Sequence, residues 1–132
     1  MPYLLDADVL SALLRNPAGP IAQRIAQAGL SAVCTSIIVA SELRFGALKR
    51  GATKLTADVE GLLSRLSVKS FETPADYRYA EIRATLEQAG TPIGGNDMLI
   101  AAHAMALDCI LVTGNEREFR RVKRLTIENW LR

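Results

Sequence analysis

The chain has 132 residues, 49% of them hydrophobic and 23% charged, which is enough apolar material for one folded domain and excludes a disordered chain. Its formal net charge of +2 permits an anionic partner without requiring one. No uncharged apolar run reaches the roughly 20 residues of a membrane span. We therefore expect one domain over residues 1–132 that does not enter a membrane.

The compartment is indicated by the N-terminus and by the cysteines. Residues 1–6 contain no basic segment followed by an apolar one, so we expect no secretory signal. Cys34 and Cys109 lie far apart in apolar surroundings and fit no C-x-x-C spacing. Without secretion, such cysteines are expected to be reduced thiols in the core. These observations predict a cytoplasmic protein.

The first half of the chain alternates short apolar segments with segments of helical spacing. Pro20 suits the first turn of a helix, Gly29 its end, and Ser36 the cap of the next helix. We predict strands at 3–5 and 32–34, and helices at 9–14, 20–28 and 36–47.

The second half continues this alternation. A continuous apolar run at 109–112 is typical of a buried strand, and Gly90 marks the end of a long helical pattern. We predict helices at 55–66, 74–90 and 96–105, and strands at 66–71, 109–112 and, more weakly, 125–127. Alternating strands and helices predict an α/β fold with a short, mostly parallel sheet and helices on both faces.

Acidic residues lie where such a sheet would form a site. Asp6 directly follows the first predicted strand, and Asp97 lies in the first turn of the helix before the fourth. Glu42 interrupts an otherwise apolar stretch of helix. Sites of open parallel sheets form beyond the carboxyl ends of the strands. We therefore expect these three carboxylates to meet at one edge of the sheet.

Clustered carboxylates require a compensating charge. Two unit charges about 4 Å apart repel by roughly 4 kcal/mol at an effective dielectric constant near 20, so a proton or a cation must offset them. With no histidine or cysteine beside them, oxygen ligands favour Mg²⁺ or Mn²⁺ over Zn²⁺. Such an ion activates water and stabilises charge on phosphate oxygens, which suits the hydrolysis of a phosphate ester.

Four segments, in order along nearly the whole chain, then resemble a known family. They are Leu4–Leu10, Thr35–Ala47, Pro92–Ala104 and Val112–Phe119. Together they resemble the PIN-domain ribonucleases, and within that family the VapC toxins of bacterial type II toxin–antitoxin systems. The resemblance implies a PIN-like fold, a metal-dependent endoribonuclease that acts on RNA, a protein antitoxin as partner, and a homodimer.

The resemblance also implies site residues. It places the family's three metal-binding acids on Asp6, Glu42 and Asp97, and a hydroxyl that orients an acid on Thr113. The fourth acid is open, because Asn115 stands where many members carry Asp. Glu116 and Glu118 are the neighbouring candidates, and Glu118 is the better of the two. The expected catalytic set is Asp6, Glu42, Asp97, Thr113, Asn115 and Glu118.

Other polar residues have a structural interpretation as well as a functional one. We expect Asp8 to cap a helix rather than to bind a metal, and His103, the only histidine, to be structural. Two basic clusters are either solvated faces or contacts to RNA phosphates: Arg44, Lys49, Arg50 and Lys54, and Arg117, Arg120, Arg121, Lys123 and Arg124.

Two other functions compete with the ribonuclease. One is a metal-dependent phosphatase or DNA nuclease, which a comparison of RNA, DNA and nucleotide substrates would distinguish. The other is a PIN-like binding module without catalysis, against which the intact acid triad argues. Stabilisation of the protein by a metal ion would separate a metal enzyme from such a module, because a ligand that binds only the folded state raises its stability.

Overall fold

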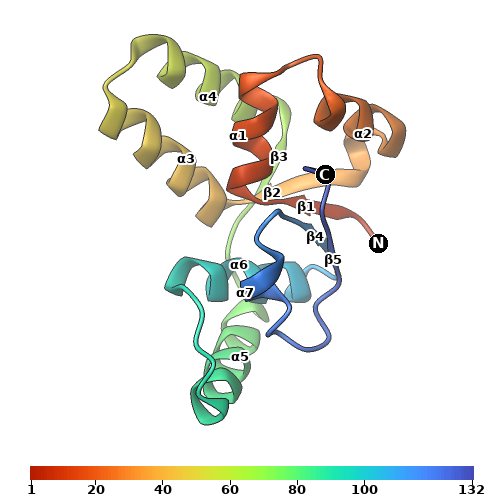
Figure 1. Ribbon diagram of the computed structural model, residues 1–132, viewed down its shortest axis with the longest axis vertical. Coiled ribbons are helices and arrows are strands. Elements are labelled where there is room, and N and C mark those ends of the chain that lie inside the picture. Colours follow the sequence, from red (N-terminus) through yellow and green to blue (C-terminus); the bar gives the residue numbers. More distant parts are fainter.

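A computed structural model describes residues 1–132 and contains one five-stranded sheet in the order β3-β2-β1-β4-β5 (Figure 1). The strands are β1 (Tyr3–Leu5), β2 (Val33–Ser36), β3 (Ser67–Lys69), β4 (Ile110–Val112) and β5 (Ile127–Glu128). Every pairing is parallel, and Leu4 of β1 is opposite Cys34 on one side and Leu111 on the other. The predicted sheet is therefore confirmed, and it is parallel throughout.

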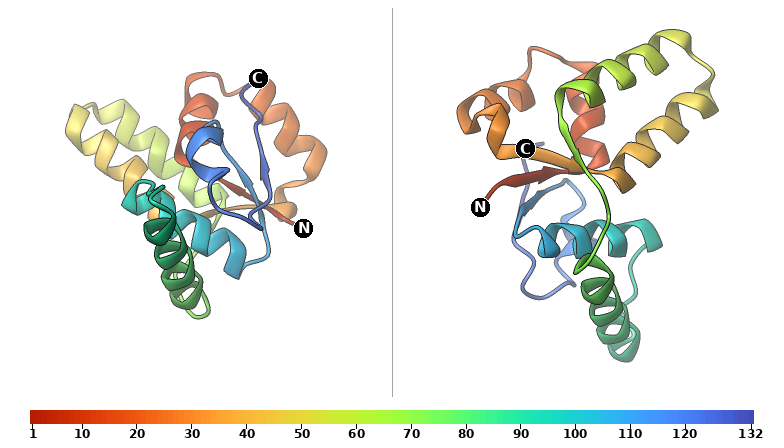
Figure 2. Two further views of the ribbon diagram at one scale, coloured as in Figure 1. Left: turned by 60° about the horizontal axis from the view of Figure 1, so that its bottom comes forward. Right: turned by 180° about the vertical axis from the view of Figure 1, so that it is seen from behind.

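Seven α-helices surround the sheet. They are α1 (Ala7–Arg15), α2 (Pro20–Ala28), α3 (Ile37–Arg50), α4 (Thr53–Arg65), α5 (Ala75–Ala89), α6 (Gly95–Ala106) and the short α7 (Glu116–Phe119). Helices α1 to α4 lie on one face and α5 and α6 on the other, as the front and back views agree (Figures 1 and 2). The predicted α/β architecture with helices on both faces is confirmed.

Local signals in the sequence account for most helix ends. Ser36 caps α3 by accepting a hydrogen bond from the Ile38 amide at 3.0 Å. Gly51 and Gly90 end α3 and α5 at φ of 65° and 69°, a left-handed conformation that glycine adopts without a steric penalty. The four-residue α7 was not predicted, and α6 begins at Gly95 rather than at residue 96.

The core lies between the sheet and the two helical layers. Leu4, Leu5 and Leu111 of the central strands are fully buried, as expected of parallel strands that are covered on both faces. Cys34 and Cys109 are buried free thiols, as predicted, and their Sγ atoms lie 4.0 Å apart. None of the helices combines the length and the apolar character that a bilayer crossing demands.

The strand order places a crevice at the centre of the sheet. The chain passes from β1 to β2 on one side of β1, whereas β4 pairs with the other side of β1. This reversal is a topological switch point, where the connections leave the carboxyl ends of neighbouring strands in opposite directions. The first residues after β1 and β4, Asp6 and Thr113, therefore face the same crevice.

Candidate active site

Asp6 is held rigidly at the centre of this crevice. It caps α1, and its Oδ1 accepts a hydrogen bond from the Ala7 amide at 2.8 Å. Its Oδ2 accepts a second bond from the Thr113 hydroxyl at 2.8 Å. Burial raises the pKa of Asp6 from 3.8 to about 6 against these two bonds, and the charges of Asp8 and Glu42 raise it further. The fold thus places a buried carboxylate where its ionised form is destabilised.

Thr113 and Asn115 connect β4 to the acids. The buried Thr113 hydroxyl, which donates to Asp6, also accepts the Asn115 amide at 3.0 Å. The Asn115 side-chain amide donates to Asp97 at 3.2 Å and to Glu118 at 2.7 Å. Asn115 therefore bridges two carboxylates through its Nδ2 instead of adding a third negative charge.

Asp97 and Glu118 are neighbouring carboxyl groups that can share one proton through a hydrogen bond. Burial raises the pKa of Asp97 to about 7, with further contributions from its hydrogen bond to Glu118 and from the charge of Asp6. The same bond, with that from Asn115, lowers the pKa of Glu118 below its ordinary value. Glu118 Oε1 also accepts the Gly94 amide at 3.3 Å, which ties it to the start of α6. Glu118 is therefore part of the cluster, whereas Glu116 points to Arg120, Asn129 and Arg132 instead.

Glu42 and Asp8 complete the cluster, and both have an unused oxygen. Burial raises the pKa of Glu42, while a hydrogen bond from Asn96 lowers it. Glu42 Oε1 and Asp8 Oδ1 are buried without any hydrogen-bond partner. The other Asp8 oxygen accepts the Gly114 amide at 2.9 Å. The expectation that Asp8 caps the helix is wrong, because Asp6 is the cap and Asp8 reaches across to the loop after β4.

Gly114 makes this contact possible. A Cβ atom at Gly114 would lie 2.8 Å from Asp8 Oδ2 and 2.6 Å from Leu131 Cδ1, so a side chain would force both away. Sequence reasoning did not identify the roles of Gly114, Asp8 and Asn96. Asp8 and Asn96 have a signal only in their positions, two residues after one cluster acid and one residue before another.

The acid cluster carries negative charge that no basic side chain neutralises. None of Asp6, Asp8, Glu42, Asp97 or Glu118 forms an ion pair with a lysine or arginine. No three acidic, histidine or cysteine side chains converge closely enough to hold a metal ion by themselves. Unpaired carboxylate oxygens nevertheless suit a hard divalent cation, because Mg²⁺ takes one or two carboxylates and keeps several waters. The donor set therefore fits such an ion.

His103 fastens the helices that carry two of the acids. It is buried in α6, and its Nε2 donates to the Ser70 carbonyl at 3.0 Å. Because a carbonyl oxygen only accepts, Nδ1 is the free acceptor and takes the Ser36 hydroxyl at 2.7 Å. Ser36 caps α3, so His103 links α6 to α3. Burial lowers the pKa of His103, which keeps it neutral in this structural role.

The two basic clusters differ in their pairing. In the first cluster, Arg44 is fixed by Glu60 at 2.9 and 3.0 Å, and Lys54 pairs with Asp58. In the second cluster, Arg120 pairs with Glu116. The remaining members form no ion pair: Lys49, Arg50, Arg117, Arg121, Lys123 and Arg124.

Comparison with known proteins assigns the chain and its fold to a family. The family model for the PIN domain matches residues 3–125. The chain is 37% identical over 131 residues to the tRNA(fMet)-specific endonuclease VapC of Salmonella typhimurium, covering 98% of each chain. It is 36% identical over 132 residues to ribonuclease VapC2 of Rickettsia felis, with the same coverage.

Solved structures agree with this assignment. The DNA-bound VapBC of Salmonella typhimurium contains a chain with a TM-score of 0.90 and 35% identity over 98% of both chains. VapBC-1 of nontypeable Haemophilus influenzae gives a TM-score of 0.87 and 32% identity over the full length of both chains. PIN nucleases as a family use divalent metal ions. The chain belongs to the PIN-domain family and, within it, to the VapC ribonucleases, the endoribonuclease toxins of toxin–antitoxin pairs.

Proposed function

We propose that this ribonuclease hydrolyses RNA phosphodiester bonds at the acid cluster around Asp6, with Mg²⁺ or Mn²⁺ as its metal ion, and that residues 1–132 form one nuclease domain. The observation that carries the proposal is the group of partly buried carboxylates with unpaired oxygens and no basic partner. A bound divalent ion would lower the pKa of a water and stabilise charge on the phosphate oxygens.

Each side chain then has a stated task. Asp6, Glu42 and Asp97 hold the metal ion directly or through waters. Thr113 keeps Asp6 oriented through its 2.8 Å hydrogen bond. Asn115 holds Asp97 and Glu118 through its side-chain amide, and Glu118 accepts or releases the proton that it can share with Asp97. No covalent intermediate is involved, because Ser36, the serine that is paired with a histidine, is fully buried and serves as the cap of α3.

We further propose that a small antitoxin covers the site, since the solved relatives are VapBC complexes. The protruding α3 leaves Phe45 and Leu48 65% and 74% exposed, which is unfavourable in water unless a partner covers them. A hollow of about 290 Å³, lined by residues of α1, α3 and α4, includes Glu42 in its wall. A partner seated there would extend to the acids. On the strength of the same family assignment, we also propose a homodimer of the toxin and a cytoplasmic location.

The substrate is tested by sequencing RNA ends after induced expression of the chain. One relative is named for tRNA(fMet), so transfer RNA is the first substrate to examine. Purified protein is then given RNA, single-stranded DNA and a small phosphate monoester in parallel. Cleavage of RNA alone supports the proposal, whereas hydrolysis of the monoester or equal cleavage of DNA contradicts it.

A further inference from the structure

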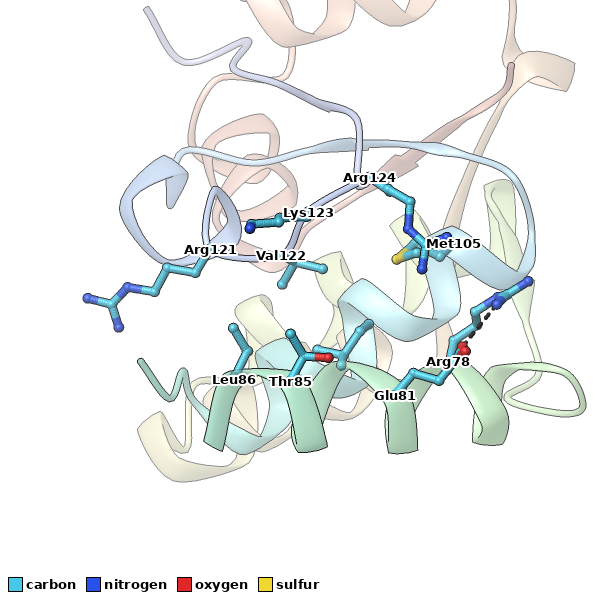
Figure 3. Close-up of a pocket in the computed structure, with 10 residues that line it drawn as sticks. Arg78, Glu81, Thr85, Leu86, Met105, Arg121, Val122, Lys123 and Arg124 are labelled. Carbon is cyan, nitrogen blue, oxygen red and sulfur yellow. Dashed lines mark hydrogen bonds and ion pairs between the residues drawn. The ribbon is translucent and has the colours of Figure 1, made fainter. Parts of the chain in front are cut away.

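A hollow far from the antitoxin-facing helices lies between α5 and the loop that leads to β5 (Figure 3). It measures about 200 Å³, and its floor is aliphatic, with Ile82 and Leu86 of α5 beneath Val122 of the loop. A second hollow of about 170 Å³ continues from it toward Met1. The two share Arg78, Met105 and Arg124. We call this continuous depression the α5 groove.

The α5 groove carries a surplus of positive charge. Four cationic side chains line the first hollow, against the single carboxylate of Glu81: Arg78, Arg121, Lys123 and Arg124. Glu81 is already paired with Arg78 at 2.9 Å, and Arg121 donates to the Pro92 carbonyl at 2.8 Å. Lys123 and Arg124 have no acidic partner. The groove therefore offers unneutralised cations to an anion.

The backbone directs one of these cations into the groove. Arg124 has a φ of 70°, in the left-handed region that side chains other than glycine and asparagine rarely adopt. Figure 3 shows its side chain extending from the loop toward Met105. Such a conformation is unfavourable by itself and is frequent where a residue serves a binding site.

The groove also adjoins the acid cluster. Arg121 lines the groove, and its bond to Pro92 holds the loop whose Gly94 amide binds Glu118. The Glu118 pKa is lowered first by its hydrogen bonds and in part by the charge of Arg121. Arg121 therefore connects the α5 groove to the acid cluster.

We propose that the α5 groove binds the RNA substrate beyond the cleaved bond, with phosphates on Lys123 and Arg124 and an unpaired base against the aliphatic floor. This inference rests on the proposed ribonuclease function and adds a subsite to it. A linear polyanion fits better than a compact small molecule, because the two hollows of about 200 and 170 Å³ follow one another as an elongated groove instead of forming one enclosed pocket. It also fits better than an apolar protein segment, because four cationic side chains line the first hollow and only Arg78 among them is paired with an acid.

The test uses two substitutions and a matched control. Lys123→Gln removes one cation, and Arg124→Gly removes the other while giving the left-handed backbone the residue that it favours. Arg83→Gln is the control, because Arg83 is an exposed arginine of α5 that pairs with Glu87 and does not line the groove. Urea unfolding establishes that all three variants are folded.

Binding is measured with a fluorescent single-stranded RNA across a range of salt concentrations, each variant being combined with Asp97→Asn to prevent cleavage. The slope of log affinity against log salt falls by about 0.7 for each phosphate contact removed, and so by about 1.4 in the double variant. Cleavage by the otherwise unmodified enzyme is measured with the same RNA and with a tetranucleotide. The KM for the long RNA rises in the double variant, which carries both Lys123→Gln and Arg124→Gly. The KM for the tetranucleotide stays unchanged in that variant.

Three results would overturn the inference. A salt slope and a KM that match those of Arg83→Gln place the groove off the RNA path. An equal loss on the tetranucleotide means that the substitutions disturb the acids instead of a separate subsite. Weaker antitoxin binding with unchanged RNA binding makes a protein the occupant. If the unmodified enzyme cleaves neither RNA, the proposed function fails on its own, and the salt slope still decides whether RNA occupies the groove.

Discussion

Replacing Asp6 by asparagine tests the charge balance of the site in the absence of metal. A pKa of about 6 in place of 3.8 means that the fold destabilises the ionised Asp6 by about 3 kcal/mol at neutral pH. Asparagine removes that penalty. Its oxygen can accept the Ala7 amide and its amide can donate to Thr113 Oγ1, but the Thr113 hydroxyl proton then loses its acceptor, at a cost of about 1 kcal/mol. The variant should therefore be about 2 kcal/mol more stable than the parent in EDTA near pH 7.5.

The pH dependence gives the prediction its sign. An acid with a raised pKa in the folded state binds more protons folded than unfolded, so stability falls as pH rises between about 4 and about 6. At low pH Asp6 is protonated in both states and the penalty disappears. Near pH 3 little more than the lost hydrogen bond remains, so the variant should be as stable as the parent or weaker by up to about 1 kcal/mol.

Urea denaturation in EDTA at both pH values measures the difference. With a slope of roughly 1–3 kcal/mol per M, a gain of about 2 kcal/mol moves the midpoint by about 1 M. A bound metal ion makes the parent the more stable of the two proteins. The parent gains about 2.7 kcal/mol of stability at a metal concentration 100 times its dissociation constant, whereas the variant gains little. A variant that is destabilised equally at both pH values, or stabilised equally by Mg²⁺, would refute the assignment of Asp6.

Three further perturbations follow from the same contacts. Glu118→Gln removes the carboxyl that shares a proton with Asp97, so the Asp97 pKa should fall from about 7 toward its ordinary value; a carbon-13 NMR titration in EDTA that finds it unchanged contradicts the shared proton. His103→Ala leaves Ser36 and Ser70 without their buried partner and should cost about 2–4 kcal/mol in urea unfolding, whereas a loss under 1 kcal/mol would mean that the link between α3 and α6 is weak. Raising Mg²⁺ at constant ionic strength should weaken binding of the cognate antitoxin if the antitoxin places an arginine among the acids. An antitoxin affinity that does not change with Mg²⁺ would mean that the antitoxin blocks the RNA path instead.

Much of the fold follows from local signals in the sequence. Ser36, Gly51 and Gly90 act through their own backbone, so a helix that begins or ends with them is recognisable without tertiary information. The alternation of apolar segments with helical patterns predicts the parallel sheet for a similar reason. By contrast, α7 spans only four residues, which is too short for a periodic pattern.

The site is less accessible to sequence reasoning. The position of Asp6 after a strand predicts its place at the crevice, because strand ends converge at the switch point. The contact of Asp8 with Gly114 joins residues 106 positions apart and has no local signature. The bridging role of Asn115 is hidden in the same way, since only the folded chain brings Asp97 and Glu118 to its two amide protons. The free and paired members of the basic clusters likewise differ only through partners distant in sequence, such as Glu60 for Arg44.

The most direct test of a metal-dependent ribonuclease at this cluster is cleavage of end-labelled RNA by the purified chain and by Asp97→Asn, in Mg²⁺, in Mn²⁺ and in EDTA. We predict cleavage by the unmodified chain with either ion, none in EDTA, and at least a hundredfold loss in Asp97→Asn, a factor that corresponds to about 2.7 kcal/mol of transition-state stabilisation. The products should carry linear phosphate ends, because an activated water is the nucleophile. Undiminished cleavage in EDTA, full activity of a folded Asp97→Asn protein, or cyclic phosphate ends would contradict the account.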